Sequence, residues 1–184
     1  MDCMAHASTD ELVAGLPRVV ASPRDRGRLE LIVRRPGVDS REVVDAGELD
    51  PAAGLVGDRW GARIAAGGRA RDVETQLTLM NSRFVALVAR DKERWPLAGD
   101  QLFVDLDLSC ANVPAGTRLR IGSAVLAVTA EPHTGCGKFV SRFGLEAVKL
   151  MNSPRGRELQ LRGIYARVVQ GGVIRTGDVV AKEP

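Results

Sequence analysis

Few aromatic residues and no long hydrophobic run occur in this 184-residue sequence. Phenylalanine, tryptophan and tyrosine make up 4% of the residues, so valine, leucine, isoleucine and alanine must build most of the core. No stretch approaches the roughly 18 consecutive apolar residues of a membrane-spanning helix, and we expect no membrane partner. Met1–His6 contains no basic segment followed by an apolar run, which predicts a cytoplasmic protein without a secretory signal.

Cysteine and histidine are also scarce, with three and two residues. An odd number of cysteines argues against a disulfide framework, and none has the spacing of a structural zinc site. The sequence lacks G-x-S-x-G, H-E-x-x-H, G-x-x-x-x-G-K-[ST] and G-x-G-x-x-G, the motifs of several hydrolase and nucleotide-binding folds. The formal charge of +3 is not clustered, so we expect a small anionic ligand rather than a nucleic acid.

Alternating apolar residues predict a mainly β, α+β domain. Twenty glycines and nine prolines provide the many turns that short strands need. The predicted strands cover residues 29–33, 75–79, 102–106, 117–121, 124–129, 164–169, 173–174 and 179–181. Two helices are predicted, over 81–93 and 138–151. Many short strands often close into a barrel, although periodicity alone leaves the closure open.

Two segments are expected to have little regular structure. Residues 1–27 are predicted to form a weakly structured N-terminal extension. Within it, Ser8–Glu11 reads either as a capping box that opens a short helix or as part of a frayed tail. Residues 61–73 are rich in glycine, alanine and arginine, which is typical of a surface loop.

The segment Glu131–Phe139 contains the residues best suited to chemistry. Cys136 lies between two glycines, so a ligand can approach its sulfur closely. The predicted helix begins beside it, and Lys138 and Arg142 add positive charge; both effects favour the thiolate. His133 is placed to act as a proton donor or hydrogen-bond partner. A thiolate can ligate a soft metal, accept a persulfide or attack a sulfur donor.

Structural or incidental roles are the alternative interpretation of the cysteines and histidines. Cys136 can instead be a small buried core residue, with its glycines serving a turn. A cysteine hydrolase is disfavoured because His133 is only three residues away, whereas the base usually comes from elsewhere in the fold. Cys110 is expected to be core or loop filler, and Cys3 and His6 to be incidental.

An ordered set of segments resembles the MOSC domain, which is named from the C-terminal part of molybdenum cofactor sulfurases. The segments are Gly57-Asp58-Arg59, the strand with Gln76, Ala98–Leu102, Gly116–Gly122, Cys136, Gly163–Val168 and Gly177–Val180. The resemblance covers residues 28–182, which implies a domain over 28–184. It implies a closed, strand-rich β-barrel with a few flanking helices and a site around Cys136.

The resemblance also implies a cofactor and several possible functions. Cys136 would be the molybdenum ligand of a bound molybdenum cofactor in an enzyme that reduces N-hydroxylated small molecules with an external electron donor. Alternatively, Cys136 would carry a persulfide received from a cysteine desulfurase. A third possibility is a non-catalytic module that only binds the cofactor. No pyridoxal phosphate site is evident in the sequence.

The resemblance also gives expected cofactor contacts, of which the arginines and the lysine suit the charge of the phosphate, while Asp58 is expected to fix its loop or Arg59 instead. Six residues are candidates: Asp58, Arg59, Gln101, Lys138, Arg142 and Arg162. The family often has histidine where this chain has Trp60, and Gly-Glu-Asn where it has Gly99-Asp100-Gln101. These two departures concern the very residues that would contact the cofactor.

Overall fold

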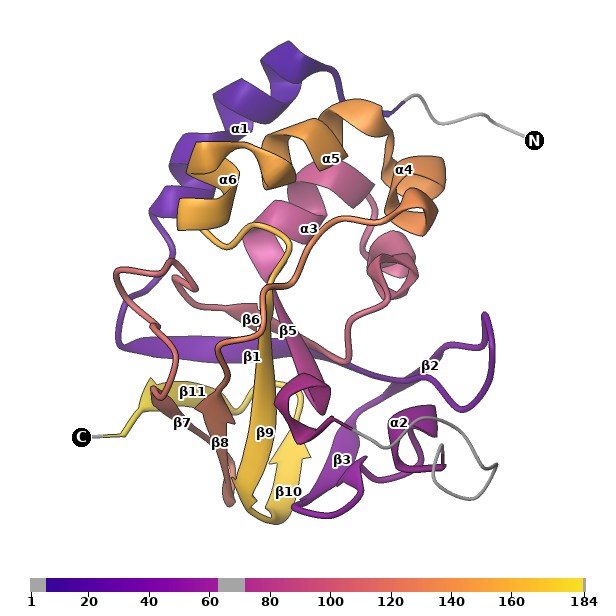
Figure 1. Cartoon of the computed structure of the whole chain (residues 1–184), viewed down its shortest axis with the longest axis vertical. Coiled ribbons are helices and arrows are strands. Elements are labelled where there is room, and N and C mark those ends of the chain that lie inside the picture. Colours follow the sequence, from indigo (N-terminus) through magenta and orange to yellow (C-terminus); the bar gives the residue numbers. More distant parts are fainter. Residues whose placement is uncertain (1–5, 63–71, 184) are drawn as a thin grey trace.

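Seven strands close into a β-barrel in the computed structural model, which describes residues 6–62 and 72–183 (Figure 1). Around the barrel they are β11 (Val179–Lys182), β7 (Arg118–Ile121), β8 (Ala124–Val128), β9 (Ile164–Gln170), β5 (Leu77–Asn81), β6 (Leu102–Asp105) and β1 (Arg26–Arg34). Strand β1 pairs with β11 and so closes the circle. Neighbouring strands are antiparallel except β5 and β6, which are parallel. The predicted closed barrel is therefore confirmed.

Four further strands extend this architecture at its edges. Strand β2 (Glu42–Val44) pairs with the end of β1. A separate three-stranded sheet contains β10 (Gly172–Arg175), β3 (Ala46–Asp50) and β4 (Gly54–Leu55), in that order. Strand β10 follows β9 almost directly, so the small sheet continues from the barrel wall.

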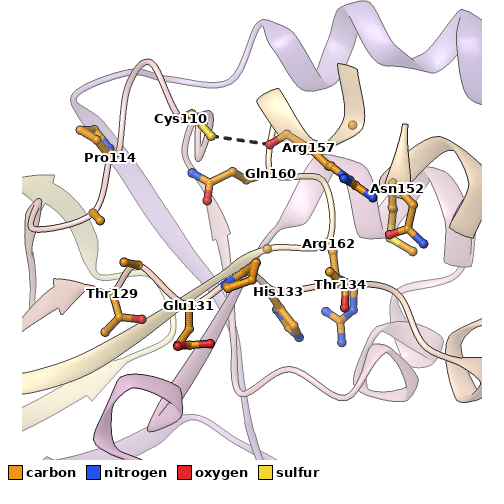
Figure 2. A pocket seen from close by; sticks show the side chains of 16 residues that line it. Cys110, Pro114, Thr129, Glu131, His133, Thr134, Asn152, Arg157, Gln160 and Arg162 are labelled. Atoms are coloured by element: carbon orange, nitrogen blue, oxygen red, sulfur yellow. Dashed lines mark hydrogen bonds between the residues drawn. The ribbon is translucent and has the colours of Figure 1, made fainter. Parts of the chain in front are cut away.

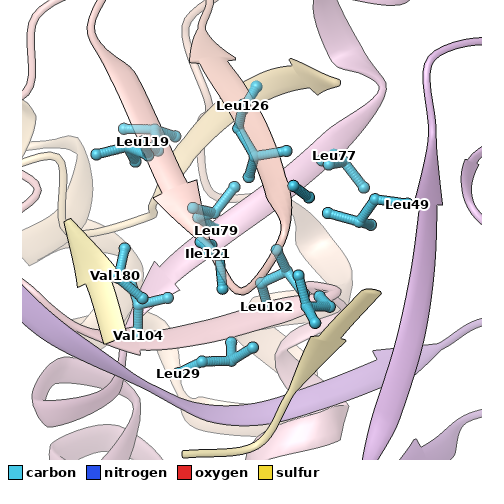
Figure 3. Packing of buried hydrophobic residues seen from close by; sticks show 14 of the residues in the cluster. Leu29, Leu49, Leu77, Leu79, Leu102, Val104, Leu119, Ile121, Leu126 and Val180 are labelled. Atoms are coloured by element: carbon cyan, nitrogen blue, oxygen red, sulfur yellow. The ribbon is translucent and has the colours of Figure 1, made fainter. Parts of the chain in front are cut away.

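The barrel interior is aliphatic, as the shortage of aromatic residues predicts. Leu77 and Leu79 of β5 and Leu102 and Val104 of β6 belong to the interior cluster, whose side chains converge in Figure 3. The intervening Phe103 belongs to a second cluster outside the barrel. This alternation is the period of two that strands impose on their side chains. It explains why the sequence pattern located most strands.

Helices cover one end of the barrel (top of Figure 1). They are α1 (Thr9–Val20), α3 (Ser82–Ala89), α4 (Gly137–Phe143), α5 (Leu145–Asn152), α6 (Pro154–Glu158) and the 3₁₀ helix η3 (Lys92–Ala98). All four phenylalanines of the chain lie in the cluster between these helices and the barrel. The short helix α2 (Arg59–Ala62) and the 3₁₀ helix η2 (Val73–Thr75) lie beside the strands instead. No helix within the described ranges has the length and hydrophobicity needed to span a membrane.

Both predicted helices are shorter than the sequence pattern indicated. The first ends at Ala89 because Arg90 adopts φ 63°, and η3 follows. The second is interrupted at Gly144, whose φ of 93° separates α4 from α5. Glycine adopts this backbone region without the steric penalty that other residues meet.

The prediction of a weakly structured N-terminal extension is wrong for residues 9–20, which form α1. The capping box is present: the Ser8 hydroxyl accepts a hydrogen bond from the backbone N–H of Glu11, whose carboxylate accepts one from the Ser8 N–H. Leu12 and Val19 are buried, and α1 packs against α3 and α5. Residues 1–5, with Cys3, and 63–71, most of the expected surface loop, lie outside the described ranges. A domain boundary at residue 28 stays a prediction.

Leu12→Ala is expected to destabilise the protein by about 2 to 5 kcal/mol, because it empties a buried site between α1 and the helical layer. Val13→Ala is the matched control, since Val13 is 57% exposed on the same helix and should change stability little. Urea unfolding of both variants checks the prediction. Equal stabilities would show that α1 does not contribute to the folded core.

Candidate functional site

Two cavities meet at the end of the barrel where β1 ends and β9 begins. The first, which we call the arginine pocket, has a volume of about 200 Å³; its polar lining is Arg35, Arg59, Arg162, His133, Thr75 and Thr78. The second, which we call the thiol cavity, has a volume of about 560 Å³ and contains Cys110 in its wall (Figure 2). His133 and Arg162 line both cavities, so they form the boundary between them.

Asp58 fixes Arg35 in the arginine pocket. Its Oδ2 accepts hydrogen bonds from the backbone N–H and Nε of Arg35, both at 2.9 Å, and its Oδ1 accepts one from Nη2 at 3.1 Å. The Nη1 group of Arg35 donates to the carbonyl of Gly99 at 3.0 Å. The carboxylate of Asp58 is completely buried by these contacts. Asp58 was expected either to contact the cofactor or to fix its loop or Arg59; in the structure it fixes an arginine, Arg35, that was not among the predicted site residues.

A second buried pair joins Arg162 to Asp100. The Nη1 group of Arg162 donates to both carboxylate oxygens of Asp100, at 2.9 and 2.7 Å, and Nη2 donates to the carbonyl of Ala98 at 3.2 Å. Asp100 has no exposed surface, and this burial raises its pKa, although Arg162 acts in the opposite direction. The Nε atom of Arg162 is buried without a hydrogen-bond partner among the described residues. Arg162 therefore retains one donor group without a partner in this part of the structure.

His133 is a neutral side chain between these two pairs. Its side chain is 8% exposed, and its ring lies 4.4 Å from the ring of Tyr165, centroid to centroid. Burial, followed by the charges of Arg162 and Arg35, lowers the pKa of His133 well below 6.5. It therefore carries no charge at neutral pH and cannot promote the Cys136 thiolate as an imidazolium. Its proton-donor or hydrogen-bonding role stays a prediction.

Cys136 is exposed beside this site. It directly precedes α4, and its carbonyl accepts hydrogen bonds from the backbone of Phe139 and Val140. Cys136 lines neither cavity as the described residues outline them. A Cβ atom added at the neighbouring Gly137 would meet no atom within 4 Å in that part of the structure, so the space at the start of α4 is open. The alternative interpretation of Cys136 as a buried core residue is wrong.

Lys138 and Arg142 turn toward a carboxylate on another loop. Each places a side-chain nitrogen 3.2 Å from Oδ1 of Asp39, and Arg142 also donates to the carbonyl of Leu97. The charges of Lys138 and Arg142 are therefore partly neutralised.

Arg41 lies near several of these positive groups. Burial and the charges of Arg142, Arg35 and Arg59 lower the pKa of Arg41, so these arginines are close to one another.

Gln101 has a structural role. Its side chain is fully buried, and its Oε1 accepts hydrogen bonds from the backbone N–H and the hydroxyl of Thr78, at 2.8 and 2.9 Å. These bonds tie the start of β6 to β5. The amide is therefore enclosed in the barrel wall, away from any ligand that enters a cavity. Arg59 and Arg162 are the expected cofactor contacts that line the arginine pocket.

Four residues of this region were not among the predicted site residues: Arg35, Asp100, Cys110 and Tyr165. Arg35 directly precedes Pro36 in a stretch without a motif, so nothing in the sequence marked it. Asp100 was noted only as a departure from the family pattern. Cys110 was expected to be filler, but it is exposed at the thiol cavity, and its sulfur lies 3.6 Å from the carbonyl oxygen of Arg157 (Figure 2).

Acidification should destabilise the protein through His133. The folded-state pKa lies below the unfolded value near 6.5, so the unfolded chain binds the proton first as the pH falls. The stability that neutral His133 contributes is thus fully present above pH 6.5. Below that pH it is lost by up to about 1.4 kcal/mol per pH unit. Urea unfolding at several pH values should show this loss in wild type and His6→Gln, but much less in His133→Gln. An equal loss in all three proteins would contradict the assignment.

Comparison with known proteins identifies the family. The MOSC domain pattern matches residues 74–181, more than half of the chain. A search of the curated proteins finds no significant match. Among solved structures, YiiM from Escherichia coli is 21% identical, with 85% of this chain and 70% of that chain covered and a TM-score of 0.55. YuaD from Bacillus subtilis is 18% identical, with 84% and 94% covered and a TM-score of 0.55. The fold is shared with these structures, and the chain belongs to the MOSC domain family.

Proposed function

We propose that this protein binds the molybdenum cofactor, with Cys136 as the metal ligand, and reduces N-hydroxylated small molecules with electrons from an external donor. The observation that carries the proposal is the arginine pocket, together with an exposed thiol three residues after His133 in the chain. Family membership supports the cofactor class. The residues of this chain supply reasons of their own, which concern charge, space and accessibility.

The arginine pocket suits an anionic group. Arg35, Arg59 and Arg162 line it together with the hydroxyl-bearing Thr75 and Thr78. Guanidinium groups favour phosphate because they donate two parallel hydrogen bonds in a rigid plane. The unpartnered Nε of Arg162 is the kind of buried donor that a bound anion would satisfy. A phosphate-bearing cofactor therefore fits the charge and the donor set of the pocket.

The volumes of the two cavities suit a phosphate and an organic ring system. At about 200 Å³, the arginine pocket is below the roughly 300–1,000 Å³ of typical small-molecule sites, so it suits a phosphate group alone. The thiol cavity is within that range at about 560 Å³ and shares His133 and Arg162 with the pocket. It offers space for the ring system of the cofactor or for a substrate.

Cys136 is the residue in this region best placed to ligate the metal. Its exposure and the open space beside Gly137 leave its sulfur accessible. In the described part of the chain, no group of three or more His, Cys, Asp or Glu side chains could hold a metal ion. A metal that arrives with its own cofactor ligands needs only one thiolate from the protein. When bound, the cofactor would supply two-electron transfer at molybdenum, and His133 would hold a proton nearby.

Molybdenum content tests the proposal. Protein purified from cells that make the cofactor should contain close to one molybdenum per chain, and Cys136→Ser should lose most of it because the thiolate ligand is gone. Cys110→Ser is the matched control and should keep its metal, because Cys110 is also an exposed thiol but is not the proposed metal ligand. Elemental analysis of the three proteins gives the answer. Molybdenum-free wild type would contradict the proposal; bound cofactor without reductase activity would indicate a binding module.

A sulfur carrier is the second candidate, favoured by one observation. Cys136 lies outside both cavities and is exposed, so a partner as large as a cysteine desulfurase can reach it. The Cys136 thiolate would attack the outer sulfur of the donor's persulfide, whose S–S bond breaks as the donor cysteine leaves as a thiolate. The reducing cytoplasmic setting that the sequence predicts would keep Cys136 free for this role.

Mass spectrometry separates this candidate from the first. After incubation with a persulfide-loaded cysteine desulfurase, the Cys136 peptide should gain the mass of one sulfur atom. The Cys110 peptide of the same protein is the internal control and should not change, because its thiol lines a cavity wall and donates to the carbonyl of Arg157, which restricts the approach of a protein donor. Modification of neither peptide, or of both equally, would argue against a carrier role.

A further inference from the structure

His133 lies among charges of both signs. Positive charges face it from Arg162, which precedes β9, and from Arg35, which follows β1; Arg59 of α2 lines the same pocket. One carboxylate lies close: Oδ1 of Asp100 is 3.8 Å from Nδ1 of His133. Tyr165 of β9 stacks on the imidazole, and its pKa is raised by burial and by the charges of Asp100 and Glu131. Tyr165 therefore stays neutral. Asp58 is paired with Arg35 and Glu131 lines the thiol cavity, and the charges that lower the pKa of His133, after burial, are those of Arg162 and Arg35.

The Nδ1 atom of His133 is a buried polar atom whose hydrogen-bonding capacity is unsatisfied. It has no hydrogen-bond partner within the described ranges, and 3.8 Å from the nearest oxygen of Asp100 exceeds hydrogen-bonding distance. A buried polar atom without a partner usually destabilises a protein and is often associated with function. A proton on Nδ1 would have Asp100 as its natural acceptor. The two arginines oppose this protonation as long as the arginine pocket contains no anion.

We propose that His133 and Asp100 form a proton-holding pair that an oxyanion in the arginine pocket switches on. The anion pairs with Arg35 and Arg162 and offsets the two charges that, together with burial, keep His133 neutral. His133 then takes one proton from solvent, and its Nδ1–H pairs with Asp100. The only bond that forms is N–H, and no electron is transferred. This inference rests on the proposed function only in requiring that the pocket binds an anion.

The pair of His133 and Asp100 would supply a proton next to the thiol cavity, where the N–OH group of a substrate would be reduced. Reduction of an N–OH group to N–H consumes two electrons and two protons and releases water. His133 lines both cavities, so it can pass a proton to a molecule in the thiol cavity while an anion occupies the arginine pocket. Asp100 acts through His133 and is therefore a positioning residue. Proton uptake would then depend on ligand binding rather than on pH alone.

Histidine NMR gives a direct test, because the chain contains only two histidines. Protein labelled at histidine is titrated between about pH 5 and pH 8, spanning the ordinary histidine pKa. Sulfate is the probe because its charge is constant over this range, and chloride at equal ionic strength is the control. His6→Gln assigns the signals. We expect sulfate to move the midpoint of the His133 titration up by about one pH unit or more.

Backbone amide shifts of Thr75 and Thr78 at fixed pH report independently whether sulfate binds. Binding without movement of the His133 midpoint overturns the inference and leaves the anion pocket intact. Absence of binding overturns the anion pocket, and with it both the switch and the support that the pocket gives to the proposed function.

Asp100→Asn tests the partner and should remove most of the sulfate-induced movement. Asp105→Asn is the matched control because Asp105 also binds an arginine through two hydrogen bonds, from Arg83 at 2.7 and 3.1 Å, but does not line the pocket. It should leave the movement unchanged. Full movement in Asp100→Asn would overturn the pairing. The wild-type comparison decides the proposal even if Asp100→Asn does not fold.

Discussion

The buried ion pair between Arg162 and Asp100 organises the mouth of the barrel. Asp100 has no exposed surface, so its charge depends on Arg162, and Arg162 depends on Asp100 to hold its guanidinium at the boundary of two cavities. Removing one partner of such a pair is strongly destabilising, because the other charge remains buried and unpaired. The pair therefore fixes a positive charge where a free arginine would move with solvent. Asp58 does the same for Arg35, and both arginines line the arginine pocket.

This arrangement gives each carboxylate a supporting role and leaves ligand binding to the arginines. Burial and these same charges keep His133 neutral, so the electrostatics of the pocket influence the protonation of the histidine. The thiol of Cys136 stands apart from this system, exposed at the start of α4. An exposed thiol outside both cavities is compatible with cofactor binding and with sulfur transfer. Cofactor binding requires Cys136 to ligate the metal, whereas sulfur transfer requires a partner protein to reach it.

The sequence located the strands because a barrel wall with an aliphatic inside imposes a clear period of two. Leu77, Leu79, Leu102 and Val104 follow it, and Phe103 fills the opposite face. The helices were harder, because Gly144 breaks a continuous apolar pattern through its backbone angle rather than its hydrophobicity. The residues of the site were the hardest to predict from the sequence. Cys136, His133, Arg59 and Arg162 were found by residue type and family pattern. Arg35 and Asp100 emerged only when residues far apart in the chain were brought into hydrogen-bonding distance, which no local pattern encodes.

The closure of the barrel by β1 and β11 has a consequence for biosynthesis. Arg26 lies opposite Ala181 across this seam, so one of the first strands to leave the ribosome must wait for the last before its free edge is covered. Until then, β1 presents unpaired backbone groups that neighbouring nascent chains can recognise. Closing so long a loop is also slow, since contacts between distant parts of a chain form late in folding. The free edge of β1 is therefore protected against aggregation only after the residues of β11 have paired with it.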